Sequence, residues 1–513
     1  MPDILSPIDG RVAYGYAELS FETALAKIEQ AETVQRSWAQ TPISERVALC
    51  QRMLEGYRAR LPEYSEQITR MMGKPLAHAR GEFRGPMRER TLALCDMAEA
   101  ALADHVLAEK PGFRRFIRRE PVGTVLDIAA WNYPLIIAIN VVVPAVIAGD
   151  AVVIKHAHQT MLVADQLEQA FVAAGAPAGL VQAMPVSHVT VAELIAKRRF
   201  GFVAFTGSVR GGHEVYRTVA RENFVGVGLE LGGKDPALVL PDCDFDHAVE
   251  NLVDGAFFNA GQSCCGIERV YVHADLYDRF VEAYVAKTRE YKLGNPLEAT
   301  TNLGPVVNPA AAERIRAQIQ QALAGGARAL VSSSDFFVPD LGRCYVAPHV
   351  LVDVTHDMDV MNEETFGPVM LLCRVRDEHH AVEVANGTGF GLSSSVFGRD
   401  RARARRISER LHAGMTAIND FGGMTYMAQD LTFGGIKQSG FGRINGREGL
   451  RACCNVKAVL DDRLPVSFPS KLYPVAEGDF ERLRATMRLV YGHGVRGRLQ
   501  GAMALVRSLR GRK

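Results

Sequence analysis

A pair of cysteines follows a turn signal in the segment FFNAGQSCCGIERV, residues 257–270. The Gly-Gln step before the pair indicates a tight turn that presents Cys264. A free thiol is already a few per cent thiolate at neutral pH, so a nearby base or cation is enough to make it a nucleophile. The alternative is a buried structural cysteine, which is the more common role of a single Cys.

Two polar side chains stand where predicted strands end. Glu230, in GLELGGKDPALVL, closes an apolar run before two glycines, and a charge there is costly unless it is paired, solvated or used. Asn132, in IAAWNYPL, lies between a predicted strand and a predicted helix, where its amide can donate to an oxygen in the same crevice. Cys264, Asn132 and Glu230 would therefore supply a nucleophile, an oxyanion donor and a general base.

The elements that must position these residues follow two patterns. Residues 21–104 carry apolar side chains at helical spacing, which predicts successive amphipathic helices. From residue 122 short apolar runs alternate with helix-length segments, a pattern typical of βαβ units around a parallel sheet. The first series of runs is VGTVLDIAA, AVVIK, LVQAMP, FVAFTG, FVGVGLEL and PALVL, and a second series follows Asp244. We therefore predict two α/β domains.

Two further segments have distinct patterns. Residues 134–149 are almost entirely apolar but shorter than the roughly 20 residues of a membrane-spanning helix, so we predict a buried helix. Residues 113–121 alternate apolar and basic side chains, which indicates an exposed strand of a hairpin that needs a partner surface.

Composition narrows the class of protein. The 513 residues include 59 Lys and Arg against 58 Asp and Glu, a net charge of +1, so no nucleic-acid partner is expected. Nine cysteines, four of them in adjacent pairs, suit no disulfide framework, and the first residues carry no secretory signal pattern. These features predict a globular protein of the reducing cytoplasm, and no metal site is expected.

Six motifs carry a resemblance to a known family. The segments EPVGTVLDIAAWNYPL, FTGSVRGG, LELGGKDP, GQSCCG, EETFGPV and LTFGGIKQSGFG occur in the order and spacing of the aldehyde dehydrogenase superfamily, over about residues 20–463. The C-terminal part is most similar to the branch that includes plant and fungal membrane-associated members. The resemblance implies NAD(P)-dependent oxidation of an aldehyde to the carboxylic acid.

The resemblance also implies a role for each catalytic residue. Cys264 attacks the aldehyde, the Asn132 side chain and the Cys264 N–H hold the oxyanion, and Glu230 activates the water that hydrolyses the thioester. Cys264 is preferred over Cys265 because the nucleophile of the family lies two residues after the glutamine, here Gln262. Cys265 is expected to pack beside it.

The fold implied by the resemblance is an α/β architecture with two Rossmann-type parallel-sheet domains and a β-hairpin oligomerisation arm. The cofactor-binding domain is expected at residues 1–104 and 122–232, and the catalytic domain at 233–449. The arm would comprise 105–121 and 450–463, and a basic extension would follow at 464–513. The arm implies a homodimer or homotetramer.

Cofactor residues also carry over from the family. Lys155 resembles the lysine that contacts the adenosine ribose, and Glu364 resembles the carboxylate that binds the hydroxyls of the nicotinamide ribose. Phe366 and Trp131 would line the nicotinamide cleft. Gly207 and Ser208 follow a predicted strand and precede a helix, where N–H groups can receive a pyrophosphate. An ordinary βα loop is the alternative for that Gly-Ser turn.

The segment KHAHQT departs from the family pattern. The family follows the lysine with a proline and then a ribose-binding glutamate, whereas this chain has His156 and His158. Loss of that carboxylate removes a hydroxyl acceptor and a charge that would repel a 2'-phosphate. Residues 184–194 also lack the glycines usual in the adenine-side loop. We expect NAD as the cofactor, with NADP not excluded.

Two alternative functions remain at this point. A CoA-acylating semialdehyde dehydrogenase commonly lacks the general-base glutamate, so Glu230 argues against it. A catalytically silent relative with a structural or binding role is disfavoured by the presence of all three catalytic residues.

The last fifty residues differ from the rest. Residues 464–513 contain ten Lys and Arg against three acids, a net of +7, which leaves −6 for the preceding residues. Leu499, Met503, Val506 and Leu509 fall at helical spacing. This pattern is typical of a helix on an anionic membrane surface, near which a hydrophobic aldehyde could arise. A solvated or subunit-docking helix is the alternative.

Overall fold

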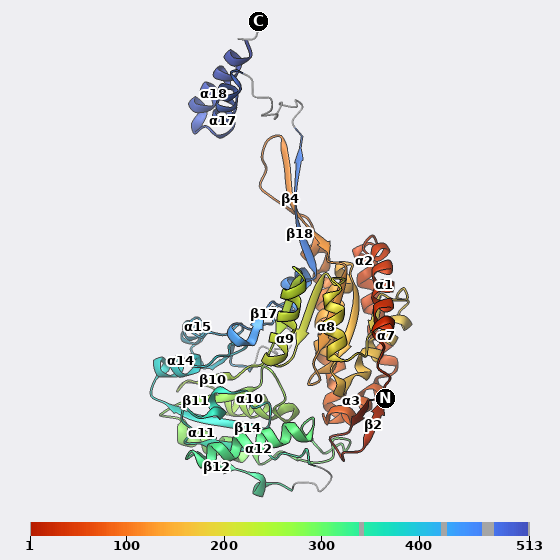
Figure 1. Ribbon diagram of the computed structural model, residues 1–513. Coiled ribbons are helices and arrows are strands. Elements are labelled where there is room, and N and C mark those ends of the chain that lie inside the picture. Colours follow the sequence, from red (N-terminus) through yellow and green to blue (C-terminus); the bar gives the residue numbers. More distant parts are fainter. Residues whose placement is uncertain (1, 338–342, 422–427, 464–476, 511–513) are drawn as a thin grey trace. The chain divides into compact units, whose positions relative to one another are not determined.

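The computed structural model describes residues 2–337, 343–421, 428–463 and 477–510. Its contacts divide the chain into two units. The larger unit, which we call the body, comprises Met1–His105 and Ile117–Lys457. The smaller, which we call the C-terminal unit, comprises Val106–Phe116 and Ala458–Lys513. Figure 1 labels many of the elements and colours the chain from the N-terminus to the C-terminus.

The first sheet of the body has six strands in the order β17-β9-β8-β5-β6-β7. Its strands are β5 (Thr124–Ala129), β6 (Ala151–His156), β7 (Val181–Ala183), β8 (Phe202–Thr206), β9 (Gly226–Glu230) and β17 (Gly440–Phe441). The connecting helices are α6 (Pro134–Ala148), α7 (Leu162–Ala173), α8 (His188–Ala196) and α9 (Val209–Glu222). All neighbours pair in parallel except β17 with β9. Because β5 lies between β6 and β8, strand order reverses at β5, and such a reversal opens a ligand crevice at the carboxyl ends of the strands.

The second sheet has seven strands in the order β12-β13-β14-β11-β10-β15-β16. Its strands are β10 (Asp235–Val239), β11 (Ile267–His273), β12 (Arg328–Val331), β13 (His349–Val352), β14 (Val369–Val375), β15 (Ser395–Phe397) and β16 (Ala417–Ile418). Its helices are α10 (Phe245–Phe257), α11 (Tyr277–Thr288), α12 (Pro309–Ala324), α13 (Asp359–Asn362), α14 (Glu378–Asn386) and α15 (Arg401–Ser408). Only β12 and β13 pair in an antiparallel direction among the described strands of this sheet.

One grouping from the apolar pattern was wrong. The run PALVL was assigned to the first series, but it forms β10, which pairs with β11 and β15 of the second sheet. The chain passes between the sheets at Gly232 and Gly233, directly before β10. An apolar run alone does not say which sheet it joins, because both sheets are buried.

A layer of helices precedes the first sheet, as predicted for residues 21–104. It comprises α1 (Phe21–Trp38), α2 (Ile43–Ala59), α3 (Leu61–Met72), α4 (Leu76–Glu82) and α5 (Arg88–Leu102), after a short antiparallel pair of β1 (Asp3–Leu5) and β2 (Val12–Gly15). The predicted buried helix is confirmed as α6, all of whose residues are buried. The indole N–H of Trp38 donates to the Val146 carbonyl over 2.9 Å and fastens the layer to α6.

The predicted strand at residues 113–121 is confirmed as β4 (Phe113–Pro121). It lies in a three-stranded sheet of order β18-β4-β3 with β18 (Cys454–Asp462) and β3 (His105–Val106). The remaining helices are α16 (Gly446–Ala452), α17 (Asp479–Tyr491) and α18 (Gly494–Arg510). Of the predicted basic extension, residues 464–476 and 511–513 lie outside the described residues. No helix in the described ranges combines the length and the hydropathy that crossing a membrane requires.

Candidate functional site

The predicted site residues gather where loops of the two sheets meet. The first sheet contributes the carboxyl ends of its parallel strands: Asn132 follows β5, Gly207 and Ser208 follow β8, and Glu230 ends β9. The second sheet contributes the loop before β11, which holds Cys264.

Cys264, Asn132 and Glu230 border one cavity of about 40 Å³. Apolar side chains of α6, among them Ile136 and Ile137, form part of its wall. Residues separated by up to 132 positions in the sequence thus line a single cavity. This is the arrangement that a nucleophile, an oxyanion donor and a general base require.

The turn before Cys264 has an unusual backbone. Asn259, Ala260 and Gly261 take φ values of 56°, 56° and 70°, so three successive residues are left-handed. A Cβ on Gly261 would overlap the Gly367 carbonyl oxygen. Glycine is therefore needed at position 261, both for the backbone conformation and because a Cβ has no space. Asn259 and Ala260 take the left-handed conformation without being glycine, so the turn before Cys264 carries backbone strain.

Amide hydrogen bonds hold this turn. The Asn132 Nδ2 donates to the Gln262 carbonyl over 3.2 Å, and Asn259 Nδ2 donates to the carbonyls of Asn132 and Gln262 over 3.0 and 3.2 Å. Gln262 Oε1 accepts from the Val307 N–H over 2.8 Å. The Asn132 amide carries a second N–H, and its nitrogen is fixed beside the residues that lead into Cys264.

The two adjacent thiols have different surroundings. Cys264 is half-buried, whereas Cys265 is buried in an apolar cluster with Leu392 and Phe433. A hydrogen bond to the Cys265 sulfur, followed by burial, raises the pKa of the Cys264 thiol well above its ordinary value. Cys264 thus requires a base or a cation in the same cavity to ionise at neutral pH.

Glu230 carries a buried carboxyl group. It is 7% exposed, and neither oxygen has a hydrogen-bond partner among the described residues. Burial raises its pKa well above the ordinary value, and the charge of Arg443 opposes that shift. A Cβ on Gly434 would lie 2.8 Å from Oε1, so the chain closes tightly against this carboxyl. Once ionised, such a group is a stronger base than a solvated carboxylate.

Gly232 and Gly233 let their own loop approach the loops of Glu364 and Cys264 closely. Glu364 Oε1 accepts from the Gly233 N–H over 3.0 Å, and a Cβ on Gly232 would overlap the same carboxyl. A Cβ on Gly233 would overlap the Cys264 carbonyl oxygen. Burial, with a contribution from Glu268, raises the pKa of Glu364 to about 8. Glu364 therefore lies beside the loop that carries the predicted nucleophile.

Sequence reasoning missed the buried pair that holds the Glu364 loop. Glu268 accepts from the N–H groups of Thr365 and Phe366, each over 2.9 Å, and pairs with the Lys234 ammonium. Phe366 takes a φ of 53°, and its ring meets Trp131 edge-on at 5.5 Å between centroids. The sequence did hold a signal for this pair, because Glu268 is a carboxylate inside the apolar strand IERVYVH.

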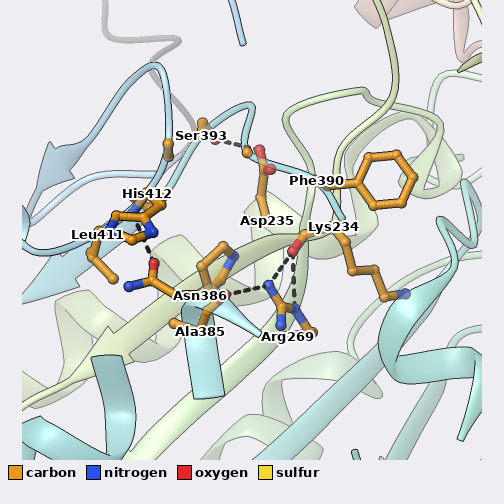
Figure 2. Close-up of a pocket in the computed structure, with 13 residues that line it drawn as sticks. Lys234, Asp235, Arg269, Ala385, Asn386, Phe390, Ser393, Leu411 and His412 are labelled. Atoms are coloured by element: carbon orange, nitrogen blue, oxygen red, sulfur yellow. Dashed lines mark hydrogen bonds between the residues drawn. The ribbon is translucent and has the colours of Figure 1, made fainter. Parts of the chain in front are cut away.

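A second buried cation, Arg269, holds the backbone of Lys234. The Arg269 guanidinium donates to the Lys234 carbonyl over 2.6 and 2.9 Å and to the Ala385 carbonyl over 3.1 Å. Figure 2 shows this fan of hydrogen bonds, with Asp235 and Ser393 hydrogen-bonded nearby. All five guanidinium N–H groups donate hydrogen bonds, so Arg269 and the residues drawn in Figure 2 support the site structurally.

A second missed pair positions the Asn132 segment. Glu82 pairs with the Lys74 ammonium over 2.7 Å and accepts from the N–H groups of Leu135 and Ile136 over 2.9 and 3.1 Å. It thereby caps the N-terminus of α6, two residues after Asn132. Neither helical spacing nor a motif marks this glutamate in the sequence.

The predicted adenosine-side residues lie at the end of β6. Lys155 is buried and forms no ion pair with any residue the structure describes, and burial lowers its pKa to about 8. His158 is exposed, and its Nδ1 shares a hydrogen bond of 2.8 Å with the Tyr16 hydroxyl. The Lys155 charge lowers the pKa of His188, at the start of α8, a neighbour that sequence reasoning missed.

The predicted phosphate-side residues begin a helix. Ser208 is the N-cap of α9, and its Oγ accepts from the Gly211 N–H over 3.2 Å. The Gly207 N–H donates to the Glu230 carbonyl over 3.0 Å. The free N–H groups of the first turn of α9 therefore open at the carboxyl end of β8, as anion binding requires.

Arg90 of α5 is a cation of the cavity that sequence reasoning also missed. It is 4% exposed and donates to Asn140 Oδ1 over 2.9 Å and to Gln429 Oε1 over 3.0 Å. Burial lowers its pKa to about 10, and the charges of Cys265 and Cys264 act in the opposite sense. It borders the same cavity as Cys264.

Comparisons with known proteins match this chain to one family over most of its length. The model of the family described as the aldehyde dehydrogenase family matches residues 2–459. Succinate-semialdehyde dehydrogenase (NADP+) of Deinococcus radiodurans is 35% identical over 470 residues, which cover 92% of this chain and 95% of that protein. Succinate semialdehyde dehydrogenase (NAD(P)+) Sad of Escherichia coli is 35% identical over 438 residues, covering 84% and 91%.

Solved structures agree with the sequence matches. The crystal structure of succinic semialdehyde dehydrogenase from Streptococcus pyogenes, in complex with NADP+, superposes with a TM-score of 0.84 at 28% identity. The alignment covers 89% of this chain and 99% of that chain. The predicted α/β fold class is confirmed.

Proposed function

Because the chain belongs to the aldehyde dehydrogenase family, we propose that it oxidises an aldehyde to the carboxylic acid through a covalent intermediate on Cys264. The observation that carries this proposal is the common cavity of Cys264, Asn132 and Glu230. The Cys264 thiolate attacks the aldehyde carbon, and the carbonyl oxygen becomes an oxyanion. The Asn132 amide and the Cys264 N–H then stabilise that oxyanion.

Glu230 acts in the second half of the reaction. The nicotinamide of a bound cofactor would accept the hydride that leaves the former aldehyde carbon, and the acyl group would stay on Cys264 as a thioester. The Glu230 carboxylate takes a proton from a water molecule, which adds to the thioester carbon. The acid leaves and the Cys264 thiolate is restored. The buried carboxyl, which has no hydrogen-bond partner among the described residues, supports this role because its raised pKa favours proton uptake.

The residues present fit a dinucleotide. Lys155 is a buried ammonium without an ion pair among the described residues, so a hydroxyl or phosphate oxygen of the cofactor would satisfy it. Ser208 and the start of α9 would hold the pyrophosphate, and Glu364 the nicotinamide ribose, beside Trp131 and Phe366.

We propose that both NAD and NADP bind. The relatives named above include NADP+ and NAD(P)+ enzymes, and residue 158, where the family pattern has a glutamate, is a histidine in this chain. His158→Glu should lower kcat/KM for NADP at least tenfold relative to NAD. Unchanged relative kcat/KM for the two cofactors would show that His158 does not face the ribose.

We propose a short aliphatic aldehyde that carries a carboxylate as the substrate class. The buried Arg90 guanidinium borders the cavity of Cys264, where its positive charge would attract a carboxylate of the substrate. Ile136 and Ile137 would pack against a hydrocarbon chain between the aldehyde and the carboxylate. This proposed substrate differs from the hydrophobic aldehyde expected from the sequence, because it carries a charged end, as does the substrate named for the relatives.

Arg90→Gln tests the substrate class. Loss of a charge-assisted hydrogen bond costs about 1.5–3 kcal/mol, so kcat/KM for succinate semialdehyde should fall about 10- to 150-fold. The value for butanal, which lacks the carboxylate, should change less than threefold. Equal losses with both aldehydes would assign Arg90 a structural role.

We further propose a homodimer or homotetramer in the cytoplasm. Val456 and Leu460 on β18 are each 64% exposed in the single chain, which supports a partner on that strand. All nine cysteines are free, which supports a reducing compartment. Light scattering of the purified protein should give two or four times 56.1 kDa.

The reaction type is tested by absorbance of the reduced cofactor with and without CoA. Turnover without CoA, with free carboxylic acid as product, is expected. A strict requirement for CoA would favour the acylating alternative, and no turnover with any aldehyde would favour the silent one.

A further inference from the structure

The two C-terminal helices lie beyond the residues matched by the family model, which end at 459. α17 and α18 pack side by side as a helical hairpin within the C-terminal unit (Figure 1). The proposed catalytic function uses none of their residues. Their surface therefore calls for a separate explanation.

Small residues form the contact between the two helices. Gly501 of α18 is buried, and a Cβ there would overlap the backbone of Arg488 and Leu489 in α17. Ala485 of α17 is also buried. The backbones thus approach closely, as in small-residue helix pairs, and few large side chains are needed between them.

The large apolar side chains consequently remain on the outside. Each helix carries them three or four residues apart, so each forms one stripe along its helix. We call these the apolar stripes, and their side chains are 43% to 76% exposed. They are Phe480, Leu483, Met487 and Val490 on α17, and Val495, Leu499, Met503 and Val506 on α18.

Basic side chains accompany the stripes. The α18 segment contains no Asp or Glu, and its Arg496, Arg498 and Arg507 form no ion pair with any residue in the described ranges. On α17, Arg482 pairs with Asp479, whereas Arg488 forms no ion pair within the same ranges. An exposed apolar surface bordered by unneutralised arginines requires an occupant that is both apolar and anionic.

We propose that this hairpin binds an anionic lipid surface, with the apolar stripes at the boundary of the acyl chains and the arginines at the headgroup phosphates. Arginine suits this position because its stem can lie along apolar surface while its guanidinium reaches the phosphates. A second copy of the hairpin is a poorer occupant, because it would bring the same positive charge against itself. The inference stands independently of the catalytic proposal.

The test is co-sedimentation of the full chain with vesicles of phosphatidylcholine alone or with 30% phosphatidylserine. Binding is expected only to the anionic vesicles, and it should weaken when the salt concentration is raised from 0.1 to 0.5 M. Arg496→Gln/Arg498→Gln should weaken binding about thirtyfold, at about fivefold for each arginine near the surface. Leu499→Ser/Met503→Ser should weaken it as well, although its net charge is unchanged.

A matched control removes the same charge elsewhere. Arg405→Gln/Arg406→Gln changes two exposed arginines of α15 and should leave vesicle binding within twofold of the unsubstituted protein. Circular dichroism and aldehyde oxidation check that each variant is folded. Absence of binding to anionic vesicles at low salt would overturn the proposal. So would equal effects of the hairpin and control variants, or a change in oligomer mass in place of vesicle binding.

Discussion

Replacing Glu230 with Gln separates the two halves of the proposed reaction. The amide has the shape of the carboxyl but does not act as a base at neutral pH. Because the Glu230 carboxyl makes no hydrogen bond with the described residues, the change breaks none of the side-chain contacts that hold the turn before Cys264. Attack by Cys264 and reduction of the cofactor should therefore proceed, whereas hydrolysis of the thioester should stall.

The kinetic effect can be estimated from the chemistry of the group. A positioned general base contributes about 10²- to 10⁴-fold, so steady-state kcat should fall by that factor, about 2.7–5.5 kcal/mol in the activation free energy. Stopped-flow absorbance should still show a burst of about one reduced cofactor per active site. Loss of the burst in a folded variant that binds cofactor would refute the assignment, as would an unchanged kcat.

The stability of the same variant depends on pH in a defined direction. Burial raises the folded-state pKa of Glu230 above its unfolded value. Its contribution to stability is therefore fully present below the unfolded pKa, near 4.5, and is lost as the pH rises towards the folded pKa. The free energy of unfolding of Glu230→Gln relative to the unsubstituted protein should rise over that interval, by about 1.36 kcal/mol for each unit of pKa shift.

Asp127→Asn is the matched control for Glu230→Gln. Asp127 is buried in β5, and burial raises its pKa in the same way, but it does not border the cavity. The control should reproduce the pH-dependent gain in stability, as measured by urea unfolding, without the loss of kcat. A fall in kcat equal to that of Glu230→Gln would show that the effect comes from the fold and not from the cavity.

Three further perturbations test the supports of the site. Gly261→Ala should reduce kcat/KM at least 100-fold, because the new Cβ overlaps the Gly367 carbonyl and displaces the turn; activity within threefold of the unsubstituted enzyme would contradict the requirement for glycine. Glu82→Gln should lower the free energy of unfolding by about 3–5 kcal/mol, since it leaves the buried Lys74 ammonium without its anion; a loss below 1 kcal/mol in urea would contradict this. Binding of NADP to the free enzyme should weaken as the pH rises through about 8, where Lys155 loses its proton; a Kd that is flat from pH 7 to 9 by fluorescence titration would argue against contact with the cofactor.

The sequence predicted the elements that local pattern determines. Most strands of the two sheets, the buried helix α6 and the strand β4 were indicated by apolar runs or by alternation of apolar residues, whereas β17 was not predicted. The alternation also anticipated that Asn132 and Glu230 lie at strand ends, where a parallel sheet opens its crevice. The pattern did not determine which sheet each strand joins, as β10 shows. A strand that is buried on both faces has the same apolar composition in either sheet.

The supporting residues could not be found in this way. Arg90 and Glu82 belong to the N-terminal helical layer, more than 170 residues before Cys264, and helical spacing does not show which side chain meets a cavity. Glu268 lies inside a strand, where a carboxylate signals an unsatisfied charge but not its partner. These residues act through contacts between distant segments, which become visible only once the two sheets are in place.

The identity of the nucleophile is tested most directly by comparing Cys264→Ala with Cys265→Ala in a single turnover with succinate semialdehyde and NADP. Cys264→Ala should reduce no cofactor although it still binds it. Cys265→Ala should keep a full burst and a thioester that fragment-ion mass spectrometry locates on Cys264. A normal burst from Cys264→Ala, or a thioester on Cys265, would contradict the account.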